Sequence, residues 1–374
     1  MKIAIGIHYF PPHVGGMEIV AKTQAKLFAA KGHDVTVLTS SVGGTPGLHT
    51  QDGYRLMRVS VWNFFERRMG VPYPFFSPSL LWRGYQIVKR VDVVHVHDVF
   101  YQTSFVMALW AKVLRKPIVV TQHVAMIPHP NMLVRFVQWL TYRTTGRFVF
   151  STSKRVTLLN AGVRDFLIAL GVPTSKLVFI PNGVDMTLFR PGKSSAIASV
   201  RKRYALPTNQ PIALFVGRFV PKKGFHKLLD ATSPDYHIAL AGGNAPAGIT
   251  TNADQVTFLG ALTPQELAEV YTAVDIFILP SEGEGFPLTI QEAMAARLPI
   301  VTSKDPGYAI YNLDPKLFMQ ITPTVEAITI ALTKLSNDPR QRAAMAEYSH
   351  TYATEHFSWD TNSNELLSIF EDIR

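Results

Sequence analysis

Short apolar runs alternate with longer segments of helical character along the whole chain, and this alternation constrains the fold more than any other feature. The runs predict strands at residues 3–7, 34–39, 91–97, 117–121 and 148–151 in the first half, and at 212–217, 237–241, 256–259, 275–279 and 299–302 in the second. Strands that alternate with helices are typical of parallel sheets with helices on both faces. The sequence therefore predicts an α/β protein with a doubly wound parallel sheet in each half.

The chain is long enough for two such domains. Its 374 residues are 47% apolar, with a mean hydropathy of +0.11, which allows two buried cores in domains of roughly 150 to 200 residues each. Pro181, Asn182 and Gly183 interrupt the pattern, so we expect the first domain at residues 1–182 and the second from there on. Residues 359–374 carry apolar side chains at helical spacing and predict a final helix.

Two glutamates in the second half have a spacing that indicates the kind of ligand. Glu284 and Glu292 are eight residues apart across the start of a predicted helix, where eight residues rise roughly 12 Å. Paired hydrolytic carboxylates lie about 5 to 10 Å apart, so the spacing argues against a glycosidase. It favours contacts with opposite ends of one elongated polar ligand, although each acid alone would also suit a solvated surface.

The segment around these glutamates predicts a strand-to-helix turn. Residues 274–280 read as a buried strand, and Pro287 suits the first position of a helix. The backbone amides of Leu288 and Thr289 would then be available to an anion. Such turns lie at the carboxyl ends of the strands, where open α/β sheets bind ligands.

A basic loop follows another predicted strand. Residues 212–217 lead into Arg218 and Lys223, ahead of a helix that begins near Phe225. Arginine offers a planar fork of donors and lysine a mobile point charge, a combination that suits a diphosphate. We expect Lys222 to be solvated, and a basic loop by itself would also fit an ordinary wet surface.

A pair of glycines, Gly15 and Gly16, separates the first predicted strand from a helix expected at about 17–31. Because glycine has no Cβ, backbone amides at this point can approach a phosphate or a sugar; a plain tight turn would use the same residues. No G-x-G-x-x-G motif follows the strand, which argues against a nicotinamide-dependent oxidoreductase.

Together these motifs resemble the family-4 retaining glycosyltransferases, the group 1 glycosyltransferases, of the GT-B architecture. The resemblance rests on Gly15-Gly16, residues 181–185, Gly217-Arg218 with Lys223-Gly224, and Glu284 through Glu292, whose order and spacing run through nearly the whole chain. It implies two Rossmann-like domains that face a central cleft. Residues 1–182 would bind the acceptor, residues 183–358 would bind the nucleotide sugar, and the C-terminal helix at 359–374 would pack back onto the first domain.

The resemblance also implies roles for single residues. Arg218 and Lys223 would bind the donor diphosphate, Glu292 the ribose hydroxyls, and Glu284 the transferred sugar. The expected donor contacts are those of Gly15, Gly16, Arg218, Lys223, Glu284, Gly285, Phe286, Leu288, Thr289 and Glu292. Groups already directed at the leaving phosphate would stabilise the charge that grows there as the anomeric bond breaks. Attack by an acceptor hydroxyl from the same face would give retention, which the resemblance alone implies.

The catalytic histidine of the family's N-terminal domain best matches His123. It follows Thr121 and Gln122 at the end of a predicted strand, where many relatives have another polar residue before the histidine. His129 is a competing candidate. A histidine beside a strand end would also suit a purely structural role.

No metal or other cofactor is expected. The sequence contains no Asp-x-Asp, and its histidines show no zinc-like spacing apart from His95 and His97. These two alternate on a predicted strand and share a face, and we interpret His97 with Asp98 as polar material on the acceptor side. Arg218, Lys223 and helix amides would neutralise the leaving diphosphate instead.

The two halves differ in charge. Residues 1–182 carry 21 Lys and Arg against 7 Asp and Glu, whereas residues 183–374 carry 16 against 20. Aromatic side chains interleave with the cations of the first half, in a set comprising Trp62, Phe64, Phe65, Arg67, Arg68, Phe75, Phe76, Trp82, Arg83, Lys89, Arg90, Arg135, Phe136, Trp139, Arg143 and Arg147. This pattern suits docking on an anionic membrane surface, where each charge contributes on the order of 1 kcal/mol; a generic solvated surface is the alternative. No nucleic-acid partner is expected, because no recognised module occurs and the acidic half would repel a polyanion.

The predicted location is the cytoplasm, at the inner membrane face. No apolar run approaches the roughly 18 residues of a transmembrane helix, residues 1–7 are too short for a signal peptide, and the absence of cysteine is compatible with a reducing compartment.

The leading hypothesis is a nucleotide-sugar-dependent hexosyltransferase that acts on a glycan or lipid-linked acceptor in cell-surface polysaccharide or glycolipid biosynthesis. A soluble enzyme similar to sucrose or glycogen synthases is one alternative. A non-catalytic nucleotide-sugar-binding subunit is another, and the presence of Arg218, Lys223, Glu284 and Glu292 together counts against it.

Overall fold

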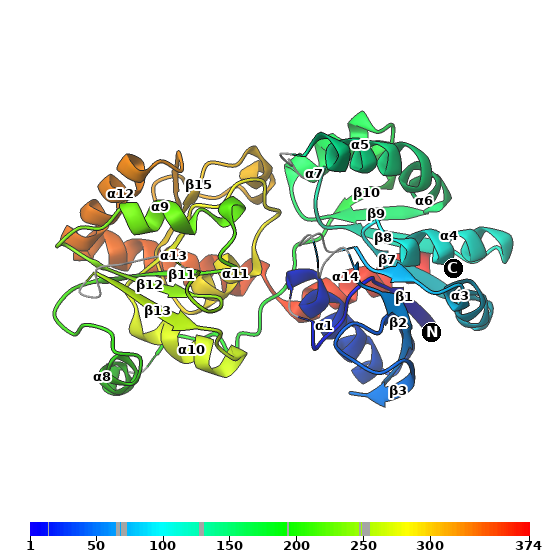
Figure 1. The fold of residues 1–374 in the computed structure, drawn as a ribbon, viewed down its shortest axis with the longest axis horizontal. Helices are drawn as coiled ribbons and strands as arrows, with labels where there is room; N and C mark the ends of the chain where they lie inside the picture. The colour runs from blue at the N-terminus through cyan, green and yellow to red at the C-terminus, as the bar shows by residue number, and fades with distance from the viewer. Residues whose placement is uncertain are drawn as a thin grey trace. The chain divides into compact units, whose positions relative to one another are not determined.

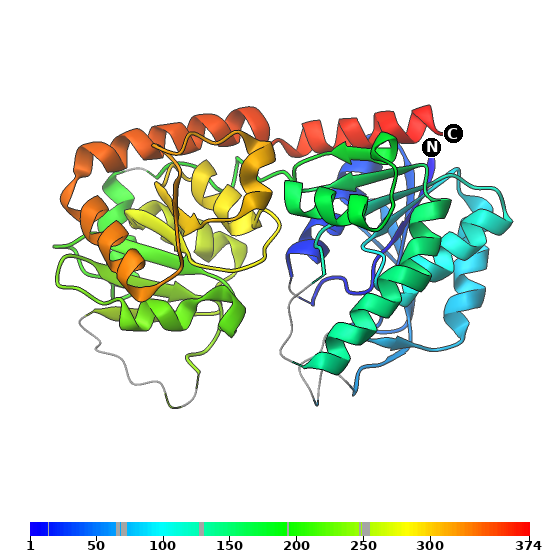
Figure 2. The same cartoon turned by 90° about the horizontal axis from the view of Figure 1, so that it is seen from above.

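A computed structural model describes residues 1–13, 15–64, 68, 73–126, 131–192, 194–246, 248 and 255–374. At residues 194–196 it describes the backbone alone. The chain divides into two compact units. The first comprises residues 1–182 and 359–374, and the second residues 183–358. Each contains a sheet with helices on both faces (Figure 1 and Figure 2).

The described part of the first unit contains an eight-stranded sheet of order β10-β9-β8-β7-β1-β2-β4-β3. Its strands are β1 (Lys2–Gly6), β2 (Asp34–Ser40), β3 (Gly47–Gln51), β4 (Tyr54–Val59), β7 (Val93–His97), β8 (Ile118–Gln122), β9 (Arg155–Leu158) and β10 (Leu177–Phe179), and a separate pair is formed by β5 (Val61–Trp62) and β6 (Phe75–Phe76). The helices are α1 (Gly16–Ala30), α3 (Ser79–Arg90), α4 (Gln102–Val113), α5 (Met132–Thr141), η1 (Tyr142–Gly146), α6 (Arg147–Thr152), α7 (Ala161–Ala169), η2 (Thr174–Lys176) and α14 (Trp359–Asp372).

Side chains on alternate positions of β1 show how the two faces of this sheet are covered. Ile3 and Ile5 belong to a core cluster with Phe28 of α1 and Phe370 of α14, and the rings of Phe28 and Phe370 meet edge to face at 5.7 Å. On the other face, a Cβ at Gly6 would lie 2.3 Å from the sulfur of Met107 on α4. The last helix of the chain therefore completes the core of the first unit.

In the second unit, the described sheet has six parallel strands in the order β13-β12-β11-β14-β15-β16. Its strands are β11 (Ile212–Val216), β12 (His237–Ala241), β13 (Val256–Gly260), β14 (Ile276–Leu279), β15 (Ile300–Ser303) and β16 (Met319–Ile321). The helices are α8 (Ser194–Arg203), η3 (Pro221–Lys223), α9 (Phe225–Asp230), α10 (Pro264–Ala273), α11 (Leu288–Ala295), η4 (Pro306–Tyr311), α12 (Val325–Asn337) and α13 (Pro339–His356).

One predicted strand is wrong. Residues 148–151 lie in helix α6, and the strand of this region is β9, a few residues later. The hydroxyls of Ser151 and Thr152 donate to the carbonyl of Phe148, three and four residues back, as helical geometry requires. A short apolar run fits either a buried strand or a buried helix, and here it continues the helical segment that begins with α5.

The sheet of the first unit is also not entirely parallel, contrary to the prediction. β3 pairs antiparallel with β4 at the edge. Asp52 and Gly53 connect them with φ angles of 47° and 81°. Two successive residues with positive φ suit the two-residue turn of a β-hairpin, which returns the chain directly onto its neighbour.

Candidate active site

Two loops of the second unit meet at the carboxyl ends of the neighbouring strands β11 and β14. The loop after β11 forms η3 and ends at Gly224, whose φ is 73° and where a Cβ would lie 2.3 Å from the carbonyl oxygen of Pro280. The Glu282 amide donates to the Lys222 carbonyl at 3.0 Å. Glycine at 224 thus permits both the left-handed turn and the close approach of the two loops.

This approach brings predicted site residues together. The Lys223 Nζ lies 3.2 Å from Oε2 of Glu284, and the Lys222 Nζ lies 3.6 Å from Oε1. Lys222 was expected to be solvated, and its side chain is 33% exposed, but the η3 turn and its tether to Glu282 also bring its ammonium group near the same carboxylate. Two cations on one acid leave a net positive charge, which suits an anionic ligand.

Arg218 lies on the same loop, two residues after the end of β11. Its side chain is exposed and has no hydrogen-bond or ion-pair partner among the residues that the structure describes. A guanidinium in this state retains all its donors for a ligand.

Glu292 lies on α11, and its carboxyl is held by a residue that sequence reasoning missed. The Tyr271 hydroxyl of α10 lies 3.1 Å from Oε2 of Glu292 and also donates to the carbonyl of Thr289 at 3.2 Å. Burial raises the pKa of Glu292 to about 7, against the lowering effect of the bond from Tyr271. A tyrosine on the buried face of a helix carries no sequence signal for such a role.

Helix α11 begins at Leu288, one residue later than predicted, and Pro287 occupies the N-cap with ψ 135°. The amides of Leu288 and Thr289 are therefore in the first turn, where a helix supplies no acceptors for them. The Thr289 hydroxyl is buried and has no partner within the described chain.

Phe286 holds the loop that carries Glu284. Its ring is buried and packs against Tyr308, Tyr311 and Phe357, with centroids 5.2, 4.2 and 5.3 Å away. Its side chain therefore faces an aromatic cluster.

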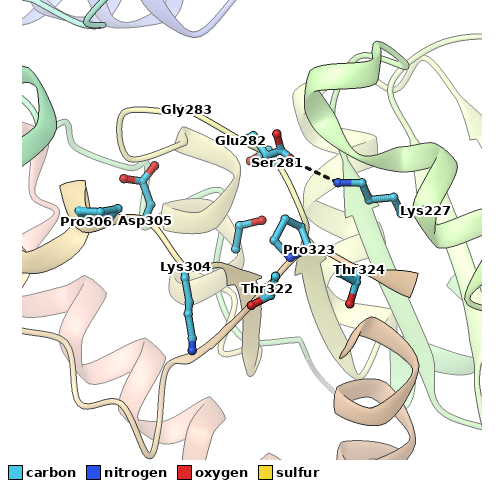
Figure 3. A pocket seen from close by; sticks show the side chains of 11 residues that line it. Lys227, Ser281, Glu282, Gly283, Lys304, Asp305, Pro306, Thr322, Pro323 and Thr324 are labelled. Atoms are coloured by element: carbon cyan, nitrogen blue, oxygen red, sulfur yellow. Dashed lines mark hydrogen bonds and ion pairs between the residues drawn. The ribbon is translucent and has the colours of Figure 1, made fainter. Parts of the chain in front are cut away.

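A cavity of about 610 Å³ lies at the carboxyl ends of β14, β15 and β16 (Figure 3). Its lining includes Ser281, Lys304 and Asp305, and Lys227 pairs with Glu282 beside it at 2.8 Å. The pKa of Asp305 is raised by burial and additionally by the charge of Glu284. The cavity therefore lies within electrostatic range of the cluster around Glu284.

In the first unit, Gly15 is the N-cap of α1, and Gly16 is its first residue. A Cβ at Gly15 would lie 2.3 Å from a carboxylate oxygen of Glu18. Glu18 is itself buried and pairs with His13 at 2.8 Å. A larger residue at 15 would therefore displace the carboxyl group of Glu18, an acid that was not singled out from the sequence.

His123 follows β8 and is buried. Its Nε2 lies 2.9 Å from Nδ1 of His97, at the end of the adjacent strand β7, and the two rings are stacked. Burial lowers the pKa of His123 to about 3. His129, the competing candidate, lies outside the described residues, as do Phe65 and Arg67 of the aromatic and basic set.

Within the described part of the chain, no group of three or more His, Asp or Glu side chains is arranged to hold a metal ion. No helix there is long and apolar enough to cross a bilayer.

Two family profiles match the chain. Residues 14–188 match Glycosyltransferase Family 4, and residues 197–351 match Glycosyl transferases group 1. The chain belongs to the group 1 glycosyltransferases. In this group 1 glycosyltransferase, the match at residues 197–351 contains the loops that carry Arg218, Lys223 and Glu284. It also contains the helix that carries Glu292.

Curated relatives are distant. The chain is 27% identical over 220 residues to a D-inositol 3-phosphate glycosyltransferase of Corynebacterium urealyticum, covering 53% of this chain and 52% of that protein. It is 28% identical over 253 residues to a GDP-mannose-dependent alpha-(1-6)-phosphatidylinositol monomannoside mannosyltransferase of Mycolicibacterium smegmatis, covering 62% and 66%. The chain thus spans between about half and two thirds of the length of these relatives.

Solved structures show the fold. Sucrose-phosphate synthase of Thermosynechococcus elongatus aligns with a TM-score of 0.79 at 19% identity, over 99% of this chain and 98% of that one. Anabaena Alr3699/HepE in complex with UDP and glucose aligns with a TM-score of 0.80 at 18% identity, over the full length of both. This group 1 glycosyltransferase therefore has the GT-B fold, with two Rossmann-like domains, as predicted.

Proposed function

We propose that the protein transfers a hexose, with retention, from a nucleotide-diphosphate sugar to a hydroxyl of a glycan or lipid-linked acceptor in cell-surface polysaccharide or glycolipid biosynthesis. The observation that carries the proposal is the cluster in which Lys222 and Lys223 lie over Glu284, at the carboxyl ends of β11 and β14. Ligands of open α/β sheets bind at such strand ends.

In this proposal each charged group has one part of the donor to bind. Arg218, Lys223 and the first-turn amides of α11 receive the diphosphate, because cations and helix N-termini attract phosphate. Glu292 accepts hydrogen bonds from the ribose hydroxyls. Glu284 accepts a hydrogen bond from a hydroxyl of the hexose. The ammonium groups of Lys222 and Lys223, which pair with Glu284 in the structure, would then contact a phosphate instead.

Catalysis then consists mainly of charge stabilisation. As the anomeric C–O bond breaks, negative charge develops on the leaving phosphate, and Lys223 and Arg218 would stabilise this charge. The acceptor hydroxyl attacks and its proton passes to the leaving phosphate. The same cations and amides take the electrostatic role that a metal has in other transferases, so the proposal requires no metal or other cofactor.

The named substrates of relatives support this class of donor. One relative is a GDP-mannose-dependent mannosyltransferase, and the Anabaena structure contains UDP and glucose. Incubation with UDP, GDP and ADP sugars, followed by measurement of nucleotide release with and without acceptor extracts, tests the proposal. Tight nucleotide binding without release across the panel would favour a non-catalytic subunit, and release with free sugar phosphates as acceptors would favour a soluble synthase.

We also propose that the protein docks on the inner face of an anionic membrane through α5. Large apolar side chains of this helix are exposed by 43% to 73%: Met132, Leu133, Phe136, Val137, Trp139 and Leu140. Burying such side chains in lipid stabilises binding by roughly 1.5 to 3 kcal/mol each at full burial.

The sequence on both sides of α5 has a charge that would favour an anionic surface. Residues 99–164 contain no Asp or Glu, and their nine cations are Lys112, Arg115, Lys116, Arg135, Arg143, Arg147, Lys154, Arg155 and Arg164. The Arg143 guanidinium lies 5.1 Å from the ring centroid of Trp139. A cation beside an exposed indole suits the interface between lipid headgroups and acyl chains. Co-sedimentation with anionic vesicles that decreases with salt is the expected result, whereas binding indifferent to both lipid charge and salt would contradict docking.

A further inference from the structure

A buried polar cluster lies in the first unit where the adjacent strands β1, β7 and β8 end. It contains His8, His97, Asp98, Gln122 and His123, each at most 6% exposed. Several of their polar atoms have no partner among the described residues, including Nε2 of His97. Buried polar atoms without a protein partner are uncommon, and each calls for an explanation.

The hydrogen bond between His97 and His123 requires a proton on one, and only one, of the two nitrogens that meet. Nδ1 of His97 and Nε2 of His123 are 2.9 Å apart, and the ring planes are inclined by 23°. Burial lowers the pKa of both rings, that of His123 to about 3. Both imidazoles are therefore neutral near pH 7, and since each carries one N–H, one ring must donate to the other.

The unpartnered nitrogen of His97 decides the direction. If His97 accepted at Nδ1, its own proton would be on Nε2, as a buried N–H without an acceptor. If His97 donates from Nδ1, Nε2 carries only a lone pair. An orphaned donor is rarer and less favourable in protein interiors than an under-used acceptor, so the second arrangement prevails.

We infer that His97 is a positioning residue that donates from Nδ1 to Nε2 of His123 and thereby fixes His123 in the tautomer with its proton on Nδ1. Nδ1 of His123 has no partner within the described chain, so it presents an N–H donor to a ligand. His123 would then donate a hydrogen bond to a sugar hydroxyl and would not act as a general base. This last consequence rests on the proposed function; the tautomer does not.

The other titratable groups in and around the cluster leave this arrangement unchanged between pH 5 and 7. Nε2 of His95 bonds to the Thr121 hydroxyl at 2.7 Å, and burial lowers the pKa of His95 to about 3. His8 stacks on Tyr101, and burial lowers its pKa as well. Burial also raises the pKa of Asp98 to about 8, while the Gln122 amide donates to its carboxyl.

The pKa of Tyr142, whose hydroxyl lies 3.5 Å from the Gln122 amide, is raised well above its usual range by burial. None of these groups therefore changes charge between pH 5 and 7.

Nitrogen-15 NMR of the full chain with labelled histidine tests the assignment, because the N–H correlation pattern of an imidazole reports which nitrogen carries the proton. The wild type is expected to show the proton on Nδ1 of His123 from pH 5 to 7. His97→Asn places an amide nitrogen close to the position of Nδ1 and should retain this pattern. His97→Leu has a similar volume but no donor, and should give a mixture of tautomers.

Activity provides a second readout. His97→Leu should lower kcat/KM about tenfold, the equivalent of one hydrogen bond, while His97→Asn should stay within about threefold of wild type. His95→Leu removes a buried imidazole from the same strand without touching His123, and should leave the His123 pattern unchanged. A wild-type proton on Nε2 of His123, or an unchanged pattern in folded His97→Leu, would overturn the inference. The NMR result stands whether or not a donor sugar is found.

Discussion

Lys223 and Glu284 follow different strands, and their side chains form an ion pair with 3.2 Å between Nζ and Oε2. Each side chain is only 17% exposed. The pair depends on the adjacency of β11 and β14 and on the close contact between Gly224 and Pro280. The effects expected from substituting Lys223 and Gly224 follow from this arrangement.

Replacing Lys223 should slow turnover far more than replacing its neighbour. Lys223→Ala removes a cation placed to stabilise the leaving phosphate, and kcat should decrease by about 100- to 1000-fold. Lys222→Ala is the matched control, because its ammonium is farther from Glu284 and more exposed; kcat should change less than about tenfold. Steady-state rates at saturating donor measure both, and equal losses would contradict the assigned role of Lys223.

Gly224→Ala should destabilise the protein and impair donor binding together. The substitution combines a φ of 73° with a collision at the Pro280 carbonyl, and we expect at least about 2 kcal/mol of lost stability. Gly32→Ala is the control, because Gly32 has a φ of 83° but no atom within 4 Å of the added Cβ. It should cost only about 1 kcal/mol and leave donor affinity intact. Urea denaturation and nucleotide titration distinguish the two variants.

Glu292 should make stability and nucleotide affinity respond to pH in opposite ways. Burial raises its folded pKa from 4.5 to about 7, so the folded state binds the proton more tightly than the unfolded state. The stability from this group is fully present below about pH 4.5 and is lost as pH rises to about 7. Affinity for the ribose hydroxyls should instead rise with pH through about 7, as the carboxylate forms.

The variant Glu292→Gln isolates this effect. At pH 8 it should be more stable than wild type by about 1 to 3 kcal/mol, and at pH 4.5 equally stable. Its nucleotide affinity should be weak and independent of pH. Thermal melts at the two pH values and calorimetric titration with nucleoside diphosphates provide the measurements, and a pH-independent stability difference would refute the role of burial.

Exposed aromatic residues of α5 should dominate membrane binding. Phe136 and Trp139 are 54% and 44% exposed, and their rings stack at 5.8 Å. The double variant Phe136→Ser/Trp139→Ser should reduce binding to phosphatidylglycerol-containing vesicles at least tenfold. Ile330→Ser, which removes a side chain of 61% exposure from α12, should have no effect. Co-sedimentation at equal lipid concentration compares them, and similar losses in both would exclude α5 as the docking element.

Transfer should survive removal of divalent cations. If Arg218, Lys223 and the amides of α11 neutralise the leaving diphosphate, prolonged dialysis against a chelator should change kcat less than twofold. Loss of activity that added Mg²⁺ or Mn²⁺ restores would refute the metal-independent mechanism.

The five strands predicted in the second half correspond closely to β11–β15, because each is a short apolar run between clear turn signals, whereas the three-residue edge strand β16 was not predicted. The run at 148–151 failed because a buried helix and a buried strand have the same composition over four residues. The edge strand β3 was missed because its polar, half-exposed sequence has no apolar run. Strands β4, β9 and β10 of the first half were not predicted either.

Predicted site residues came from loops that follow strands and from the starts of the helices after them, whereas their partners could not be predicted. The pairing of Tyr271 with Glu292, and of His97 with His123, depends on which elements become neighbours in space. A single sequence orders the strands along the chain but does not show that β7 lies beside β8. For the same reason the contact of Lys222 with Glu284 was not foreseen.

The position of α14 has a consequence for synthesis on the ribosome. Phe370 and Leu366 complete the core that contains Ile3 and Phe28, so the segment translated first must wait for residues near the end of the described chain before its interior closes. Residues 183–358, which are contiguous, meet no such delay. The second unit can therefore fold first, while the nascent first unit holds exposed apolar surface that is a target for chaperones.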